Sequence, residues 1–136
     1  MGVIRNLPAD QIEILLQEAL VYRIACTHPD EPRPYLVPIA LAYDGMNLVG
    51  HTGHGTKLRA MRANPLVVIE VDRADASDIW ESVVCQGTFR ELGGVDRESA
   101  LHRLYPVQRD FPDLGEMTVV FEIEITKKTG RYERPT

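Results

Sequence analysis

The sequence lacks several features that would assign it to a class at once. Cysteine is scarce: Cys26 and Cys85 are far apart, and each sits in an apolar run. This argues against a disulfide framework and predicts two buried thiols. No window approaches the roughly 18 apolar residues of a membrane helix, and the first residues contain no apolar run of signal-peptide length. We therefore expect a cytoplasmic protein without a membrane partner.

Basic charge is also in short supply. Fifteen Lys and Arg residues stand against twenty Asp and Glu, which gives a net charge of −5 and a pI of about 5.3. Broad nucleic-acid binding needs a basic face, so no nucleic-acid partner is expected. Repeats and linkers are absent as well. With 136 residues, 44% of them hydrophobic, the chain is expected to form a single domain over residues 1–136.

Motifs for nucleophilic or metal chemistry are missing too. The GxSxG pattern does not occur, and no serine lies in a nucleophile elbow. His51 and His54 are separated by two residues, but no third ligand lies nearby, whereas zinc normally takes three or four protein ligands. We therefore expect no metal site.

The apolar residues that are present follow helical spacing in three segments. Residues 8–20 carry Ile12, Leu15 and Leu16 on one face and begin after Pro8, which suits a helix start. A second helix is expected over 56–64 and a third over 96–105. In the second, Leu58 and Met61 are expected to point inward, and the polar side carries Lys57, Arg59 and Arg62.

The remaining apolar runs predict six strands. Residues 20–27 form one, and residues 34–52 form a hairpin around Asp44-Gly45, a pair that tolerates the positive φ of a tight turn. Pro38 places the first arm of this hairpin at an edge or bulge. Residues 66–72 are expected to be buried on both faces, and 79–92 form the next strand. The last strand, 116–132, has one shared face: Met117, Val119, Phe121, Ile123 and Ile125.

Long strands with short connections favour a closed or nearly closed barrel, mostly antiparallel, because closure removes exposed edges.

The segment GHTGHGTKLRAM, residues 50–61, carries the densest set of candidate binding residues. A strand runs into a glycine-rich turn and then a helix start, where free amides and the helix dipole bind anions. Gly53 and Gly55 allow close backbone approach, and Lys57 adds a charge. The spacing matches neither a Walker loop nor a dinucleotide fingerprint. A phosphate cradle and a plain glycine-rich turn are equally compatible with these residues.

The order of the segments narrows this choice. The hairpin YLVPIALAYDGMNLVGHT, the turn GHGTK, the helix LRAMRANP, the strand VVIEVD and the run W…SVVCQGTFREL together resemble the flavin-binding split β-barrel proteins. The chain is most similar to the branch related to pyridoxamine 5′-phosphate oxidase that includes nitroimidazole-resistance proteins. The resemblance covers about residues 10–130.

The resemblance implies a fold, a cofactor and an assembly. The fold is α+β but mainly β, a six-stranded antiparallel Greek-key split barrel with flanking helices. The cofactor is FMN, held in two clefts at the interface of a homodimer. The residues that the resemblance assigns to the cofactor are Val37, Pro38, Ile39, His51, Thr52, Gly53, Thr56, Lys57 and Trp80, with Val83 to Gln86 approaching from either subunit.

The implied activity is that of an FMN-dependent oxidoreductase acting on a small flat acceptor such as a nitroaromatic. His51 is the candidate catalytic residue, because a histidine titrates near neutrality and is able to donate a proton or hydrogen bond. A non-catalytic flavin-binding or sensing module is an alternative. A split barrel that uses haem, with His51 or His54 as axial ligand, or a deazaflavin is another, although an anionic deazaflavin tail calls for more basic residues.

Overall fold

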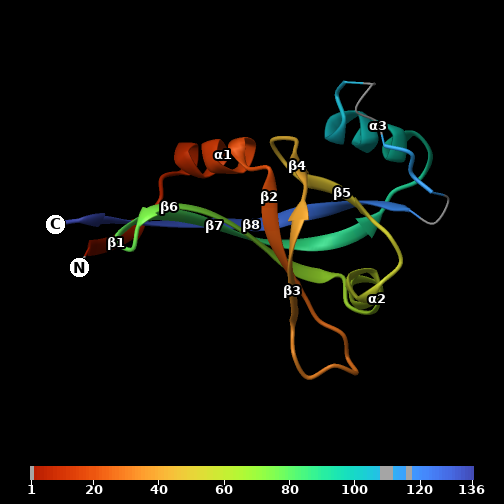
Figure 1. The fold of residues 1–136 in the computed structure, drawn as a ribbon, viewed down its shortest axis with the longest axis horizontal. Coiled ribbons are helices and arrows are strands. Elements are labelled where there is room, and N and C mark those ends of the chain that lie inside the picture. Colours follow the sequence, from red (N-terminus) through yellow and green to blue (C-terminus); the bar gives the residue numbers. More distant parts are fainter. Residues whose placement is uncertain (1, 108–111, 116–117) are drawn as a thin grey trace.

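The computed structural model describes residues 2–107, 112–115 and 118–136. These residues form a strongly curled sheet with helices at its margins (Figure 1). The helices are α1 (Ala9–Glu18), α2 (Thr56–Ala63) and α3 (Gly94–Leu104). The strands are β1 (Gly2–Asn6), β2 (Val21–Cys26), β3 (Tyr35–Ala40), β4 (Ala42–Tyr43), β5 (Leu48–Thr52), β6 (Leu66–Ala76), β7 (Ile79–Glu91) and β8 (Val119–Pro135).

The strands form one antiparallel sheet, and the chain itself connects the two edges of this sheet. Their order is β3-β2-β6-β7-β8-β5-β4, and β1 also pairs with β8. The two end strands, β3 and β4, are consecutive in sequence and are separated only by Leu41. The chain therefore steps from one edge of the sheet to the other at Leu41, and the sheet curls into a split barrel. The predicted fold class is confirmed.

The predicted hairpin over residues 34–52 is only partly right. Residues 35–40 pair with β2, and only Ala42 and Tyr43 pair with β5. Asp44 donates its backbone N–H to the Asn47 carbonyl at 3.0 Å, which leaves the two-residue loop Gly45-Met46 with Gly45 at φ +92°. The turn is thus correctly placed, and β3 has a single partner strand among the described residues, as the edge position predicted for Pro38 requires. Because the first arm is split in two and β1 is added, the described residues form eight strands where six were expected.

The prediction that residues 66–72 are buried on both faces is wrong. Val67, Ile69 and Val71 point into the core, whereas Leu66 and Val68 are 66% and 40% exposed. The alternation is that of a strand with one face on the core. The continuous apolar run therefore reflects an outer face that carries apolar side chains on the surface of the single chain.

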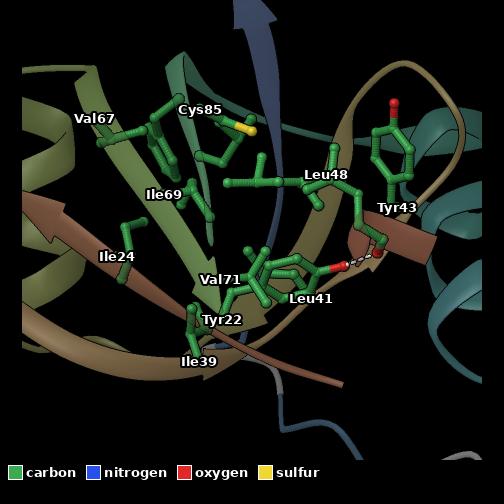
Figure 2. Close-up of a cluster of buried hydrophobic side chains, with 14 of the residues drawn as sticks. Tyr22, Ile24, Ile39, Leu41, Tyr43, Leu48, Val67, Ile69, Val71 and Cys85 are labelled. Atoms are coloured by element: carbon green, nitrogen blue, oxygen red, sulfur yellow. Dashed lines mark hydrogen bonds between the residues drawn. The ribbon is translucent and has the colours of Figure 1, made fainter. Parts of the chain in front are cut away.

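The barrel interior forms the main core. Figure 2 shows side chains from β2, β3, β5, β6 and β7 converging on one another, with Leu41 among them at the point where the sheet closes. Cys26 and Cys85 are buried free thiols, as predicted, and burial raises the pKa of Cys85 to about 11. On β8, Phe121 and Ile123 are fully buried, which agrees with the predicted face. Met117 lies outside the described residues.

The helices cover the sheet where the sequence places them. In α1, Ile12, Leu15 and Leu16 are buried, and the buried hydroxyl of Tyr22 donates a 2.6 Å hydrogen bond to the Leu16 carbonyl (Figure 2). In α2, Leu58 and Met61 are buried as expected. Helix α3 starts two residues earlier than predicted and packs on β5 and β8, where Val49, Ala100, Leu101 and Val120 form a second small core. None of the described helices is long and apolar enough to cross a membrane.

Candidate functional site

The turn between β5 and α2 leaves a helix start open to solvent. Strand β5 ends at Thr52, and α2 begins at Thr56 after the exposed residues 53–55. The first helical hydrogen bond runs from the Arg59 amide to the Gly55 carbonyl at 3.0 Å. No side chain among the residues that the structure describes caps the helix, and its first turn holds no acidic residue. The leading amides of α2 are therefore available to an anion. We call residues 52–57 the cradle.

The two glycines of the cradle are not required by the fold. A Cβ atom built on Gly53 or Gly55 would meet no atom of the described residues within 4 Å, and neither residue has a positive φ. Gly55 has φ −171°, an extended conformation that any residue adopts. Neither packing nor backbone conformation therefore explains the glycines. Open space beside a bare backbone fits the close approach of a ligand, such as a phosphate group.

Lys57 places positive charge at the cradle. Its side chain is half-buried and forms no ion pair with a described residue. Burial raises the pKa of Cys26, and the charge of Lys57 partly opposes this. The charge of Lys57 also contributes, after burial and Arg97, to the lowered pKa of His51. In a chain with a net charge of −5, a half-buried lysine that has no ion-pair partner in the described part of the chain, beside the open helix start, marks a local site for an anion.

The hydroxyls of the cradle have different surroundings. Thr52 is buried and donates its hydroxyl to the Gly53 carbonyl at 3.1 Å, so it shapes the turn. Thr56 is exposed at the helix start and remains in position to donate to a ligand.

His51 lies on β5 just before the cradle and is joined to α3. Its Nε2 atom is 2.6 Å from the hydroxyl of Tyr105, within a hydrogen bond. Burial, followed by the nearby charges of Arg97 and Lys57, lowers the pKa of His51 below its ordinary value. This shift favours the neutral imidazole, whose Nε2 either donates to or accepts from Tyr105 according to the tautomer.

Strand β3 connects the cradle region with the surroundings of His51. Tyr35, at its start, shares a cavity with Thr56, and Ile39, near its end, lines a groove of about 640 Å³ together with His51 and Tyr105. These two positions are four residues apart, roughly 13 Å along a strand. Val37 faces the interior between them, and Pro38 is exposed. The structure thus brings the predicted residues of β3, β5 and α2 into one region.

Trp80 does not belong to this region within one chain. It pairs with Ala74 on β6, eight residues beyond Leu66, and that spacing is roughly 26 Å along a strand. Figure 1 shows the β6–β7 turn at the end of the sheet opposite α2. The indole Nε1 donates a 2.8 Å hydrogen bond to Glu133. In the segment 83–86, Val83 and Cys85 are core residues.

Sequence reasoning missed Tyr105, because nothing local distinguishes the residue that follows α3.

The fold gives the class of the protein, and comparison with known proteins gives its family. The fold is that of an antiparallel split barrel, and residues 8–132 match the family model described as pyridoxamine 5′-phosphate oxidase. The chain belongs to this family.

Two solved structures show the likeness over nearly the whole chain. A FAD-binding protein from Mesorhizobium loti is 31% identical, with a TM-score of 0.78, and the match covers 97% of this chain and 99% of that one. A candidate 5-nitroimidazole antibiotic resistance protein from Bacteroides thetaiotaomicron shares the fold at 18% identity and a TM-score of 0.77, with 96% and 88% covered. An uncharacterized protein of Rhizobium meliloti is 37% identical over 70 residues, which are 52% of this chain and 45% of that protein.

Proposed function

We propose that this chain binds the FMN unit of a flavin at the cradle and is an oxidoreductase for a small flat acceptor such as a nitroaromatic. The observation that carries the proposal is Lys57, a half-buried cation without a described ion-pair partner, beside an uncapped helix start and two glycines that the fold does not need. The relative from Mesorhizobium loti, which is FAD-binding by name, supports a flavin.

Each part of the site has a role in this proposal. Lys57, Thr56 and the leading amides of α2 hold the phosphate, with Gly53 and Gly55 keeping the approach open. Strand β3 around Pro38 lies at the end of the strand order of the described sheet, and along this edge a ring system is oriented. When bound, the flavin supplies transfer of a hydride or of single electrons. His51 and Tyr105 offer a hydrogen-bond donor in the groove beside Ile39, where the acceptor is expected.

The visible spectrum of the purified protein tests the cofactor. Flavin bands, or their appearance on adding FMN, support the proposal, whereas a Soret band favours the haem alternative. Lys57→Ala is expected to weaken flavin binding by roughly 1.5–3 kcal/mol, because a charge-assisted bond is lost. Arg5→Ala, which removes the same charge from exposed strand β1, is the matched control. Equal flavin affinities in the wild type, Lys57→Ala and Arg5→Ala would show that the cradle is a plain turn and not a phosphate site.

Catalysis is tested separately from binding. With the flavin reduced under anaerobic conditions, a nitroaromatic is added and reoxidation of the flavin is followed. Faster reoxidation with the acceptor than without it supports an oxidoreductase. A flavin that binds but reoxidises at the same rate in both cases would identify a non-catalytic binding module.

We further propose a homodimer in which a second copy covers the outer face of β3, β2 and β6. Leu36, Ala25 and Val68 lie side by side in the strand register on this face, and Leu36 is 65% exposed in the single chain. Arg23 bridges to Glu70 and Asp72 in the neighbouring row. An apolar row beside a compensated charge cluster suits burial against an identical surface.

Light scattering coupled to gel filtration tests the dimer. Leu36→Glu is expected to yield monomers, because a dimer would bury the new charge without a partner. The control is Val95→Glu on the exposed side of α3, where Val95 is 84% exposed. A monomeric wild-type protein, or a dimer that survives Leu36→Glu, would remove this face as the interface.

A further inference from the structure

The open groove of about 640 Å³ beside His51 is lined by residues from the ends of α1 and α3. Both helices lie on the same side of the sheet, with β4 between them (Figure 1). We call this space the acceptor groove, because the proposed function assigns the acceptor to it. Its volume falls within the roughly 300–1,000 Å³ of sites for small molecules. Part of the lining is apolar and comes from the segment after α1 and the end of β3: Ala19, Leu20, Val21, Ile39 and Ala40.

The polar part of the acceptor groove comes from β5 and the end of α3. It contains the hydrogen-bonded pair of His51 and Tyr105, and Arg103, which precedes Tyr105 by two positions. Arg103 brings a permanent positive charge, whereas no Asp or Glu among the described residues lines the groove. A ligand in this space therefore meets a guanidinium and no carboxylate from the described part of the chain.

Arg103 is held in place but keeps the capacity to bind a second anion. Its Nη1 atom donates to Asp44 at 2.7 Å, and the other carboxylate oxygen of Asp44 accepts backbone amides of the tight turn. This ion pair orients the guanidinium, which has five N–H donors in all. The same chain shows one guanidinium serving two carboxylates, since Arg23 bonds to Glu70 and Asp72, both at 3.2 Å.

Positive charge also acts on the part of the groove around His51. Burial, and then the charges of Arg97 and Lys57, lower the pKa of His51. Two cations outside the groove lining thus favour negative charge near the imidazole, in addition to Arg103 within the lining. This local excess of cations stands out in a chain with a net charge of −5.

We propose that the acceptor groove selects aromatic carboxylates and that Arg103 is the residue that binds the carboxylate. The aromatic ring packs against the apolar part of the lining, and the carboxylate forms a charge-assisted hydrogen bond with the guanidinium. This inference rests on the proposed function and deepens it, because it makes the flat acceptor an anion and assigns its charge to one residue.

Calorimetric titration of the full chain with 4-nitrobenzoate and with its methyl ester tests the proposal. The two ligands share the nitro-bearing ring and differ in charge. The wild type is expected to bind the carboxylate at least about tenfold more tightly, because only the carboxylate forms a charge-assisted bond to Arg103. Arg103→Gln is expected to lose this preference by weakening binding of the carboxylate alone. Arg90→Gln is the matched control, since exposed Arg90 is paired with Glu122 at 3.0 Å and lies outside the groove lining.

The NMR signals of the His51 ring locate the ligand in the wild type. Binding of 4-nitrobenzoate is expected to shift them, and thermal melts check that Arg103→Gln is folded. Equal binding of the acid and the ester would overturn the proposal. A preference that survives Arg103→Gln, or binding that leaves the His51 signals in place, would do so as well.

Reoxidation of the reduced flavin by the same two compounds separates this inference from the proposed function. If both compounds accelerate reoxidation but bind without a preference for the acid, the oxidoreductase stands and the carboxylate site is wrong. If 4-nitrobenzoate binds through Arg103 but does not accelerate reoxidation, the carboxylate site stands and the proposed activity is wrong.

Discussion

The Nε2 atom of His51 and the hydroxyl of Tyr105 lie 2.6 Å apart, although 54 positions separate them in the sequence. The contact links strand β5, which leads into the cradle, to the residue that follows helix α3. Burial, and then the charges of Arg97 on α3 and Lys57 on α2, lower the pKa of His51. The surroundings of the proposed site therefore favour its neutral form, and the hydroxyl of Tyr105 orients the ring.

The titration of His51 is expected to respond to Lys57. Burial and the two nearby cations lower the pKa of His51, so its NMR titration midpoint should lie below that of a free histidine. Lys57→Ala removes one of these cations and is expected to raise the midpoint, whereas Arg5→Ala is expected to leave it in place. A midpoint that falls or stays unchanged in Lys57→Ala would show that the lysine does not face the imidazole.

Substitution of Gly55 in the cradle and of Gly45 in the tight turn should have different effects on flavin binding and on folding stability. Gly55→Ala is expected to leave the thermal midpoint close to that of the wild type, because its Cβ has free space and its φ is −171°, yet to weaken flavin binding. Gly45→Ala is expected to cost about 1–2 kcal/mol of stability, because φ at Gly45 is +92°, and to leave binding unchanged. Loss of stability in Gly55→Ala would mean that the cradle glycines serve the fold.

Glu70 gives the stability of the chain a pH dependence. Burial, then the adjacent Asp72, raises the pKa of Glu70 from 4.5 to about 7, and Arg23 opposes this only in part. Between these values the folded chain binds more protons at Glu70 than the unfolded chain, so this contribution to stability is lost as the pH rises. Glu70→Gln is expected to be more stable than wild type at pH 8 by roughly 1 kcal/mol, after allowance for solvent screening.

Urea denaturation at several pH values checks the effect of Glu70→Gln. The two proteins should converge as the pH falls below 4.5, where Glu70 becomes protonated in both states. Glu98→Gln, an exposed position on α3, serves as the control. A difference that stays constant with pH would indicate altered packing and not titration.

The buried hydroxyl of Tyr22 should stabilise the docking of α1. Tyr22→Phe leaves the Leu16 carbonyl without its 2.6 Å hydrogen bond, which is expected to cost about 1–2 kcal/mol in chemical denaturation. Tyr132→Phe is the matched control, since Tyr132 is only half-buried. Equal losses in both variants would show that the aromatic packing, and not the hydrogen bond, is affected.

Local patterns predicted most of the fold because each element carries its own signal. The spacing of Leu58 and Met61 placed α2, and Asp44-Gly45 placed the tight turn. The pairing of β3 was not predictable in this way. Residues 34–43 read as one arm of a hairpin, and only closure of the sheet, a long-range event, divides them at Leu41 between β2 and β5. The predicted burial of Leu66 and Val68 was wrong for a related reason, because the apolar content of a strand does not show what covers each of its faces.

The candidate site, too, could be predicted from the sequence only in part. The cradle was predictable, since strand, glycines, helix start and Lys57 are contiguous in sequence. Tyr105 and Arg97 come from another segment, and no spacing rule connects them to His51. Trp80 was assigned to the cofactor through the family resemblance alone, and the length of the β6–β7 hairpin sets it apart from the cradle in a single chain.

That hairpin makes the chain's one tryptophan a natural optical reporter. Since Trp80 stands at the end of the sheet opposite α2, a flavin in the cradle cannot touch the indole of its own chain. Added flavin would then quench the fluorescence of Trp80 by contact only across a subunit boundary. The dependence of this quenching on protein concentration would report assembly of the subunits without an introduced label.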